Sequence, residues 1–362
     1  MTILDFRNKL ILAPMVRTGT LPMRLLAYKY GADIVFSPEV IDKAIHRAKR
    51  VENYITGTID YLNEHGKIVF QTKPCERNRL VFQMGSADEN IALEAAKIVD
   101  RDVSAFDLNC GCPKWFSIQG GMGAALLDNS EKLCKILKTL VENTEKQVTC
   151  KIRINKDFQK TINLVKQIES TGVSAITVHT RTPSDKPTDP ADWNCLSAIV
   201  NSVSIPVIAN GDIFSLEDAE KIKQQTGCAS VMMARAAQAN PSVFRKEGLL
   251  PLYEVTREYV KNSIDVDNIF HNTKYVTLQM WPLRKDSIHL NIAQTKTMKD
   301  IAKAFDLLEY YESVVKDRET RGAEYEKFNT QKRHDYSEEL PYIPREEYLP
   351  DSVKNKIRLG SN

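Results

Sequence analysis

Short apolar runs alternate with amphipathic stretches along the first two thirds of the chain. Eight runs rich in β-branched and aliphatic residues indicate buried strands, at residues 10–13, 34–36, 81–84, 105–109, 148–152, 175–179, 206–210 and 230–234. Apolar positions recur at helical spacing in residues 88–99, 130–142, 161–171 and 215–225. Such alternation gives parallel strands, and eight units favour an α/β TIM (β/α)₈ barrel over an open, doubly wound sheet.

The alternation of strand-like and helical runs ends near residue 248. The predicted barrel domain therefore covers residues 1–248. Helical spacing continues at 253–264, 271–278, 293–305 and 307–317, and predicts an all-helical C-terminal domain over residues 249–317. Residues 318–362 are charged and tyrosine-rich, and we expect a tail that can pack back on the protein. An additional apolar run at 68–71 predicts a local hairpin.

Composition narrows the possible classes of protein. The 362 residues are 42% hydrophobic, enough to bury a large core, and 50 Lys and Arg against 47 Asp and Glu leave a formal charge of only +3. Contact with a nucleic acid must therefore come from local basic patches. There is no signal-peptide pattern, the seven cysteines are scattered and no metal-ligating spacing occurs, so we expect a cytoplasmic or nuclear protein without a metal or a membrane segment. We also expect a monomer.

Polar residues lie at the ends of successive predicted strands, where a barrel carries its chemistry. They are Gln83, Asn109, Lys151 with Arg153, His179, Asn210 and Arg235. A single polar residue at such a place often only satisfies loop backbone groups. Their occurrence on six strands in turn predicts a functional site at this mouth of the barrel.

The last two strands end in a pattern that suits a phosphate group. Asn210-Gly211-Asp212 follows the seventh strand, where glycine allows close approach of the backbone, and Ala234-Arg235 follows the eighth. An ordinary Asn-Gly turn explains the first pattern alone, but the arginine at the next strand favours one bound phosphate. The phosphate of FMN fits this interpretation.

Lys151 admits two functional interpretations. Together with His179 it can stabilise negative charge on the N1/C2 side of a reduced flavin, while Gln83 binds the edge of the ring. A lysine in a barrel can also form a Schiff base, so an aldolase is an alternative. A structural salt bridge is the simplest role, but Lys151 ends an apolar strand.

A loop with two cysteines follows the fourth strand. It runs Asn109-Cys110-Gly111-Cys112-Pro113-Lys114 and continues to glycines 120, 121 and 123, which predicts a mobile loop above the barrel mouth. A thiol, with an ordinary pKa of about 8.5, is mostly protonated at neutral pH and can donate to a developing carbanion. The residues alone do not decide between Cys110 and Cys112.

Local basic groups are candidates for contact with RNA. Lys43, Arg47 and Arg50 have the spacing of one helix face, and Arg77 and Arg79 lie in a predicted turn. A solvated surface is the simpler explanation of the helix face. The segment Lys114-Trp115-Phe116 places a cation beside two aromatic residues, a combination that suits phosphate attraction and base stacking.

These motifs together resemble those of the dihydrouridine synthase family. The resemblance runs from LAPMV at Leu12 to MARAAQANPSVF ending at Phe244, and its most specific part is DLNCGCP at residues 107–113, followed by Gly123-Ala124. The segments NCGCPKWFSIQGGMGAALL and VHTRTPSDKP are similar to the eukaryotic branch that acts on uridine 20 of tRNA. We therefore expect a fungal-type member, without the double-stranded RNA-binding domain that animal members carry.

The resemblance implies roles for individual residues. Cys112, which precedes the proline, would be the proton donor, and Cys110 would occupy a variable position of the motif. The expected flavin contacts are Pro14, Met15, Gln83, Lys151, His179, Asn210, Gly211, Asp212, Ala234 and Arg235. The residues expected to contact the substrate are Asn109, Lys114, Arg153 and Arg181.

The resemblance also implies a reaction. NADPH or NADH reduces FMN, the flavin N5 delivers hydride to uracil C6, and Cys112 protonates C5, on a uridine that leaves its stack to reach the flavin. The helical domain would grip the tRNA. Three alternatives stay open: an FMN barrel that reduces a small pyrimidine or dihydroorotate-like molecule, the aldolase using Lys151, and a non-catalytic tRNA chaperone.

Overall fold

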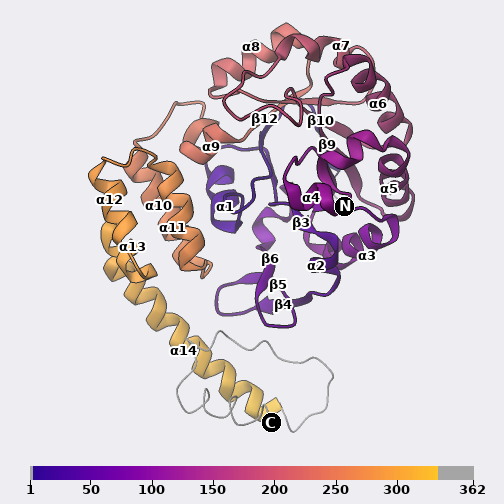
Figure 1. Cartoon of the computed structure of the whole chain (residues 1–362). Coiled ribbons are helices and arrows are strands. Elements are labelled where there is room, and N and C mark those ends of the chain that lie inside the picture. The colour runs from indigo at the N-terminus through magenta and orange to yellow at the C-terminus, as the bar shows by residue number, and fades with distance from the viewer. Residues whose placement is uncertain (1–2, 333–362) are drawn as a thin grey trace.

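The computed structural model describes residues 3–332, and its central feature is a barrel of parallel strands (Figure 1). The described strands close into a ring because β2 pairs with both β1 and β7. The eight barrel strands are β1 (Leu10–Leu12), β2 (Ile34–Phe36), β7 (Leu80–Gly85), β8 (Ala105–Cys110), β9 (Gln147–Arg153), β10 (Ala175–His179), β11 (Val207–Asn210) and β12 (Ser230–Met233). The expected TIM barrel is confirmed, and the short strand β3 (Val40–Ile41) adds a further pairing to β7.

Helices surround the barrel, and several begin at side-chain caps. Asp88, for example, accepts hydrogen bonds from the backbone amides of Asn90 and Ile91, and Asp157 and Ser215 cap later helices in the same way. The helices of this layer are α1 (Leu21–Lys29), α3 (Glu89–Val99), α5 (Ser130–Asn143), α6 (Phe158–Ser170), α7 (Leu196–Val200) and α8 (Leu216–Thr226), joined by the shorter α2 (Asp42–His46), α4 (Trp115–Gln119) and α9 (Arg235–Ala239).

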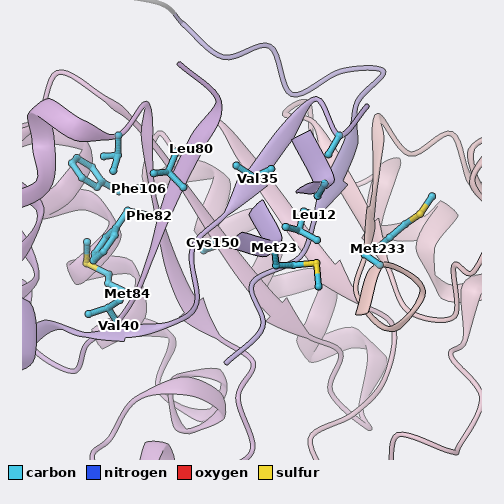
Figure 2. Packing of buried hydrophobic residues seen from close by; sticks show 14 of the residues in the cluster. Leu12, Met23, Val35, Val40, Leu80, Phe82, Met84, Phe106, Cys150 and Met233 are labelled. Carbon is cyan, nitrogen blue, oxygen red and sulfur yellow. The ribbon is translucent and has the colours of Figure 1, made fainter. Parts of the chain in front are cut away.

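Side chains alternate along each strand between two buried regions. On β8, Phe106, Leu108 and Cys110 pack outward against the helices, in the large cluster of which Figure 2 shows a part. Ala105, on the same strand, instead joins a smaller cluster inside the barrel. That inner cluster consists of Leu4, Phe6, Ile11, Ala13, Ile34, Phe36, Val81, Ala105, Ala175, Ile208 and Met232. The inward positions nearer the carboxyl ends of the strands lie above this apolar cluster and carry polar side chains.

An antiparallel sheet is inserted between β2 and β7. It contains β4 (Lys49–Asn53), β5 (Thr58–Leu62) and β6 (Ile68–Thr72), so the hairpin expected at 68–71 is confirmed. The helix face expected for Lys43, Arg47 and Arg50 is wrong, because α2 ends at His46 and Arg50 lies in β4. The guanidinium of Arg50 donates to the buried carboxylate of Asp102 at 2.6 and 3.0 Å, so a long-range partner holds this arginine in the sheet.

A helical unit follows the barrel, as expected. It consists of α10 (Leu252–Asp265), α11 (Phe270–Met280), α12 (Ser287–Gln294), α13 (Met298–Ala304) and α14 (Leu308–Lys332). The single helix expected at 293–305 is wrong, because Thr297 and Asp300 form a capping box that starts a new helix. None of the helices in residues 3–332 is long and apolar enough to cross a membrane.

The last described helix crosses the boundary that the sequence predicted at residue 318. Arg318 lies inside α14, is buried, and donates a hydrogen bond to the carbonyl of Ile264. The segment from 318 to 332 therefore continues the helix and does not begin a tail. Residues 333–362, to which the rest of that expectation applies, lie outside the described residues.

Candidate functional site

A carboxylate lies inside the barrel, above the apolar filling. Asp107 follows Ala105 by two residues on β8, so its side chain also points inward, and it is fully buried. Gln83 Nε2 donates to Asp107 Oδ2 at 2.8 Å, and Thr149 Oγ1 donates to Oδ1 at 2.7 Å. Burial raises the pKa of Asp107 to about 6, although these two hydrogen bonds and the charge of Lys151 oppose the rise.

Lys151 carries a partly buried ammonium group beside this carboxylate. It lies on β9 in register with Asn109 and Thr177, and in residues 3–332 its ammonium group makes no hydrogen bond or ion pair. The hydroxyl of Thr177 is likewise buried without a partner in the described structure. Burial, followed by the charge of Arg153, lowers the pKa of Lys151 to about 8. A desolvated cation of this kind suits an anionic or carbonyl oxygen of a ligand.

The guanidinium of Arg181 makes hydrogen bonds to other groups of the protein. Its side chain is only 3% exposed. Nε donates to the carbonyl of Asp189 at 2.7 Å, Nη2 donates to both oxygens of Asp212 at 2.6 and 2.7 Å, and Nη1 lies 3.2 Å from His179 Nε2. The geometry gives no support to the expected contact of Arg181 with substrate, because its hydrogen-bonding groups face other parts of the chain.

His179 ends β10 among cations. Burial lowers its pKa far below the usual value, and the charges of Lys151, Arg153, Arg181 and Arg235 lower it further. The imidazole is therefore neutral at physiological pH. The mouth of the barrel is positive because of these four residues, and a neutral histidine among them can still offer a hydrogen bond.

The turn after β11 has the backbone shape that the Asn-Gly pattern predicted. Gly211 and Asp212 have φ values of 121° and 52°, and a Cβ on Gly211 would lie 2.9 Å from Ala191 Cβ, so only glycine fits there. Asn210 Nδ2 donates to the carbonyl of Met232 and fixes this turn against β12. Arg235 forms an ion pair with Asp212. The structure thus brings together the residues expected to hold a phosphate.

The carboxylate of Asp212 joins the two arginines of this turn. It accepts from Arg181, from Arg235 and from the backbone amide of Ala191 at 2.7 Å. Burial alone would raise the pKa of Asp212, but the hydrogen bonds from Arg181 and Ala191 outweigh it, and the pKa lies below the usual value. Arg235 is also partly exposed, so its guanidinium can serve a ligand at the mouth.

The structure distinguishes the two cysteines of the loop. Cys110, the last residue of β8, points outward and is fully buried, and burial, followed by a hydrogen bond with Cys150, raises its pKa well above the usual value. Cys112 lies beyond the strand and is only partly buried. The neighbouring Gly111 packs against Arg153, since a Cβ on Gly111 would lie 3.3 Å from Arg153 Cγ, so the cysteine loop borders the cationic mouth.

The loop that carries Cys112 is held by two local features. Asn109 Oδ1 accepts from the backbone amides of Gly111 and Cys112 at 3.0 and 3.2 Å. Gly123 has a φ of 57°, and a Cβ there would lie 2.6 Å from the carbonyl oxygen of Cys112. Ala124 donates its backbone N–H to that same oxygen at 2.9 Å. Asn109, predicted as a substrate contact, is therefore also the residue that shapes the cysteine loop.

Other expected residues lie at the same end of the barrel. Pro14 and Met15 follow β1 and are half-buried, and Met15 packs against the inner apolar cluster. Ala234 directly follows β12. Arg153 ends β9, where Nη1 donates to the carbonyl of Thr182 at 2.8 Å.

Two acidic residues of the mouth were missed by the sequence prediction. Asp107 could have been found by counting two positions back from Asn109 along the strand. Glu39, in the loop after β2, had no such signal. Among the described residues its Oε1 is buried without a hydrogen-bond partner, and burial raises the pKa of this carboxyl group. Within residues 3–332, no group of His, Cys, Asp and Glu is placed to hold a metal ion.

Exposed groups beside the mouth offer a surface to a larger ligand. Trp115, at the start of α4, is 76% exposed, and Lys114 beside it is exposed as well. The side chain of Phe116, the third member of the predicted segment, lies outside the described part of the structure. Arg79 instead lies over the ring of Tyr28, 4.7 Å from its centroid.

The helical unit borders the loop after β1. Asn272 of α11 donates to the carbonyl of Arg17 at 2.7 Å and accepts from the hydroxyl of Thr20 at 3.0 Å. The guanidinium of Arg17 lies over the ring of Tyr275, 5.2 Å from its centroid. Since Met15 belongs to the same loop, the helical unit and the barrel mouth adjoin one another.

Comparison with known proteins gives consistent matches. The family model described as dihydrouridine synthase matches residues 11–333. The chain is 43% identical over 322 residues to a tRNA-dihydrouridine(20) synthase of Schizosaccharomyces pombe, covering 85% of this chain and 67% of that protein. It is 37% identical over 303 residues to the Saccharomyces cerevisiae protein of the same name, covering 76% and 78%. A tRNA-dihydrouridine(20a/20b) synthase of Schizosaccharomyces pombe is 36% identical over 238 residues, covering 65% and 68%.

Proposed function

The chain belongs to the dihydrouridine synthase family, and from this premise we propose that it uses FMN and NAD(P)H to reduce the C5–C6 double bond of a D-loop uridine in tRNA. The names of the relatives specify tRNA and NAD(P)+, and two of them specify position 20. We assign this chain to uridine 20 because the two relatives so named are similar to it over more of its length than the 20a/20b relative is. The observation that carries the proposal is the ammonium of Lys151, which has no partner in the described residues, at a cationic mouth that also holds the Cys112 thiol.

The residues at the mouth fit FMN. Arg235 and the turn at Gly211 and Asp212 would hold its phosphate, and Lys151 and His179 would face the electron-rich part of the ring system. Gln83 has a defined orientation, because an ionised Asp107 only accepts hydrogen bonds and so takes the Nε2 of the amide. The carbonyl oxygen of Gln83 therefore remains available to a ring N–H.

Two hydrogens must reach the uracil, and the protein supplies one of them. When bound, FMN that NAD(P)H has reduced would supply the hydride for C6. The thiol of Cys112 holds the proton for C5, and Asn109 fixes the loop that presents this thiol. Lys151 would stabilise the negative charge that a reduced flavin carries on its N1/C2 side before the hydride is transferred.

The surface beside the mouth fits a folded RNA better than a small pyrimidine. Trp115 offers an exposed ring for base stacking, Lys114 and Arg17 offer positive charge, and the helical unit extends this surface beyond the barrel. A reductase of small molecules would need only the mouth. The D loop is also a favourable target, because a base in a flexible loop unstacks at the lowest cost.

The test uses the full chain loaded with FMN, supplied with NADPH and an unmodified tRNA transcript. We expect a flavin absorption spectrum and dihydrouridine in the transcript, and none in a matched transcript with cytidine in place of uridine 20. Reduction of free uracil or of a dihydroorotate-like compound without reduction of tRNA would favour the small-molecule reductase. A protein that binds no flavin and whose Lys151 is trapped by borohydride with a keto substrate would favour the aldolase.

A further inference from the structure

We propose that Arg181 is a positioning residue that fixes the tautomer of His179, so that Nδ1–H is the ring donor offered to the flavin. The inference deepens the proposed function and rests on it for the identity of the ligand. The tautomer itself follows from protein contacts alone. It also replaces the substrate contact that the sequence predicted for Arg181.

The guanidinium of Arg181 is fixed on three sides. The carbonyl of Asp189, the carboxylate of Asp212 and the ring of His179 each receive one of its nitrogens, at distances between 2.6 and 3.2 Å. With only 3% of the side chain exposed, rotation of the group would break several charge-assisted hydrogen bonds at once. The position of Nη1 against His179 is therefore determined by the whole set of contacts.

This contact decides which ring nitrogen of His179 carries the proton. A guanidinium group only donates hydrogen bonds, so His179 Nε2, 3.2 Å from Arg181 Nη1, must accept. Burial and the cations around the ring lower its pKa and keep it neutral, and a neutral imidazole carries a single N–H. Because Nε2 accepts, the proton lies on Nδ1.

The surroundings of the ring leave its other edge for a ligand. A Cβ added to Gly211 would lie 3.2 Å from His179 Cδ2, so the phosphate turn lies against the Cδ2–Nε2 edge. The opposite edge carries Nδ1. In the described residues Nδ1 makes no hydrogen bond to the protein, so the fixed N–H is free for an acceptor atom of the flavin.

Asp212 extends the effect of Arg181 to the phosphate end of the site. The same carboxylate that receives Arg181 Nη2 also pairs with Arg235. Arg181 thus holds the histidine and, through Asp212, the arginine expected to bind phosphate. Loss of Arg181 should weaken flavin binding without any direct contact between Arg181 and the flavin.

The first test is the tautomer, measured by ¹⁵N NMR on protein with labelled histidine and no flavin. Among the six histidines, His179 is identified by the signal that disappears in His179→Gln. We expect a protonated Nδ1 in the wild type and a shift towards protonated Nε2 in Arg181→Met and in Arg181→Lys. Arg181→Lys keeps the charge opposite Asp212, and so keeps the variant folded, but one ammonium cannot span all three partners.

A matched control separates this effect from a general loss of structure. Arg50→Lys disrupts another largely buried arginine that donates twice to one carboxylate, on the separate sheet. It should leave the His179 signal unchanged. A wild-type ring with the proton on Nε2, or a tautomer that is the same in both Arg181 variants and the wild type, would overturn the proposal.

The second test separates positioning from substrate contact. Arg181→Lys should weaken FMN binding by about 5- to 10-fold, the effect of one lost hydrogen bond, while the KM for tRNA at saturating FMN stays constant. A raised KM with unchanged FMN affinity would overturn the proposal in favour of direct substrate contact. A wild-type protein that binds no FMN would instead refute the proposed function, and the NMR result would still decide the tautomer.

Discussion

Two buried groups of charges in this protein differ in how completely they are paired. The first links α1 to the segment that follows β6, through Arg24 and Glu76, which are 1% and 0% exposed. Arg24 donates to both oxygens of Glu76 at 2.9 and 2.7 Å and to the carbonyls of Gly19 and Gln71. Thr72 donates a further hydrogen bond to Glu76. No polar atom of the pair needs a ligand.

The second group, at the barrel mouth, is paired incompletely. Asp107 has two neutral hydrogen-bond donors and a pKa raised to about 6, and Lys151 has no hydrogen-bond or ion-pair partner in the described residues and a pKa lowered to about 8. The pKa of each group is therefore shifted towards neutral pH from the ordinary value of its side chain. The comparison teaches that a fully paired buried ion indicates a structural link, whereas an unpaired one indicates a place for a ligand.

The largest expected effect concerns the thiol of the mouth. Cys112→Ala should lower dihydrouridine formation by about 10²- to 10⁴-fold, since it removes the proton donor, and should leave FMN and tRNA binding intact. The measurement is single-turnover formation of dihydrouridine in a tRNA transcript. Cys110→Ala is the matched control and should keep the rate, because Cys110 faces the helices. Equal rates for Cys112→Ala and the wild type would remove the acid assignment.

The next largest effect is a difference in stability between variants of the two groups of charges. Arg24→Met leaves Glu76 buried without its partner and should lower the free energy of unfolding by about 3–5 kcal/mol. Lys151→Met, in contrast, removes a partly buried charge that has no partner in residues 3–332, and should leave the stability of the flavin-free protein unchanged or higher, while weakening FMN binding. Urea unfolding measures both. A comparable loss of stability in Lys151→Met would contradict the distinction between the groups.

Asp107 should make stability depend on pH. Because its pKa is raised from 3.8 to about 6 in the folded protein, the folded state binds the proton more tightly, and stability falls as pH rises from about 4 to about 6. The contribution is up to about 3 kcal/mol, present in full below pH 4 and lost above pH 6. Asp107→Asn should lack this component when urea unfolding of the flavin-free protein is compared across that range.

Asp102 provides a control, because its contribution to stability should change with pH in the opposite direction. Asp102 is also buried, but its hydrogen bonds from Arg50 and Tyr61 outweigh burial and lower its pKa. Asp102→Asn should therefore remove a component that increases stability with rising pH. Identical pH profiles for Asp107→Asn and the wild type would show that the carboxylate at the mouth does not titrate in this range.

The smallest effect concerns the surface beside the mouth. Trp115→Ala should weaken tRNA binding by about 1–3 kcal/mol, the usual contribution of one stacked base, and Trp115→Phe should weaken it less. Binding of unmodified tRNA to the flavin-loaded protein is the measurement. Leu249→Ala, at another exposed apolar residue, serves as control. A loss of affinity that is equal in the Leu249 and Trp115 variants would argue against stacking.

The barrel was predictable because its strands are short apolar runs with polar ends. Each strand is buried on both faces, so the runs are nearly continuous in the sequence, and Lys151, His179 and Asn210 stand out where they end. The break between α12 and α13 was not evident from apolar spacing, because it depends on the capping box at Thr297. The helix face assigned to Arg50 failed because its partner Asp102 is distant in sequence.

Roles within the site were harder to predict than its location. Arg181 lies just after a strand end, where a charged side chain suggests a ligand contact. In the folded protein its guanidinium instead donates to Asp189 and Asp212, and the sequence gives no sign of these contacts. The choice between Cys110 and Cys112 needed the end point of β8, since residues at i and i+2 of one strand face the same side, and Cys112 differs from Cys110 only because the strand ends at Cys110. Sequence patterns thus located the functional end of the barrel, and long-range pairing determined which groups remain free.

The most direct test of the account is a single turnover under anaerobic conditions. The flavin-loaded protein is reduced, NADPH is removed, and unmodified tRNA is added while the flavin absorption is followed. We predict that oxidised flavin returns together with an equal amount of dihydrouridine, detected as a gain of two hydrogen atoms in the mass of the D-loop fragment. Flavin that stays reduced in the presence of tRNA, or reoxidation without any change in the RNA, would contradict the account.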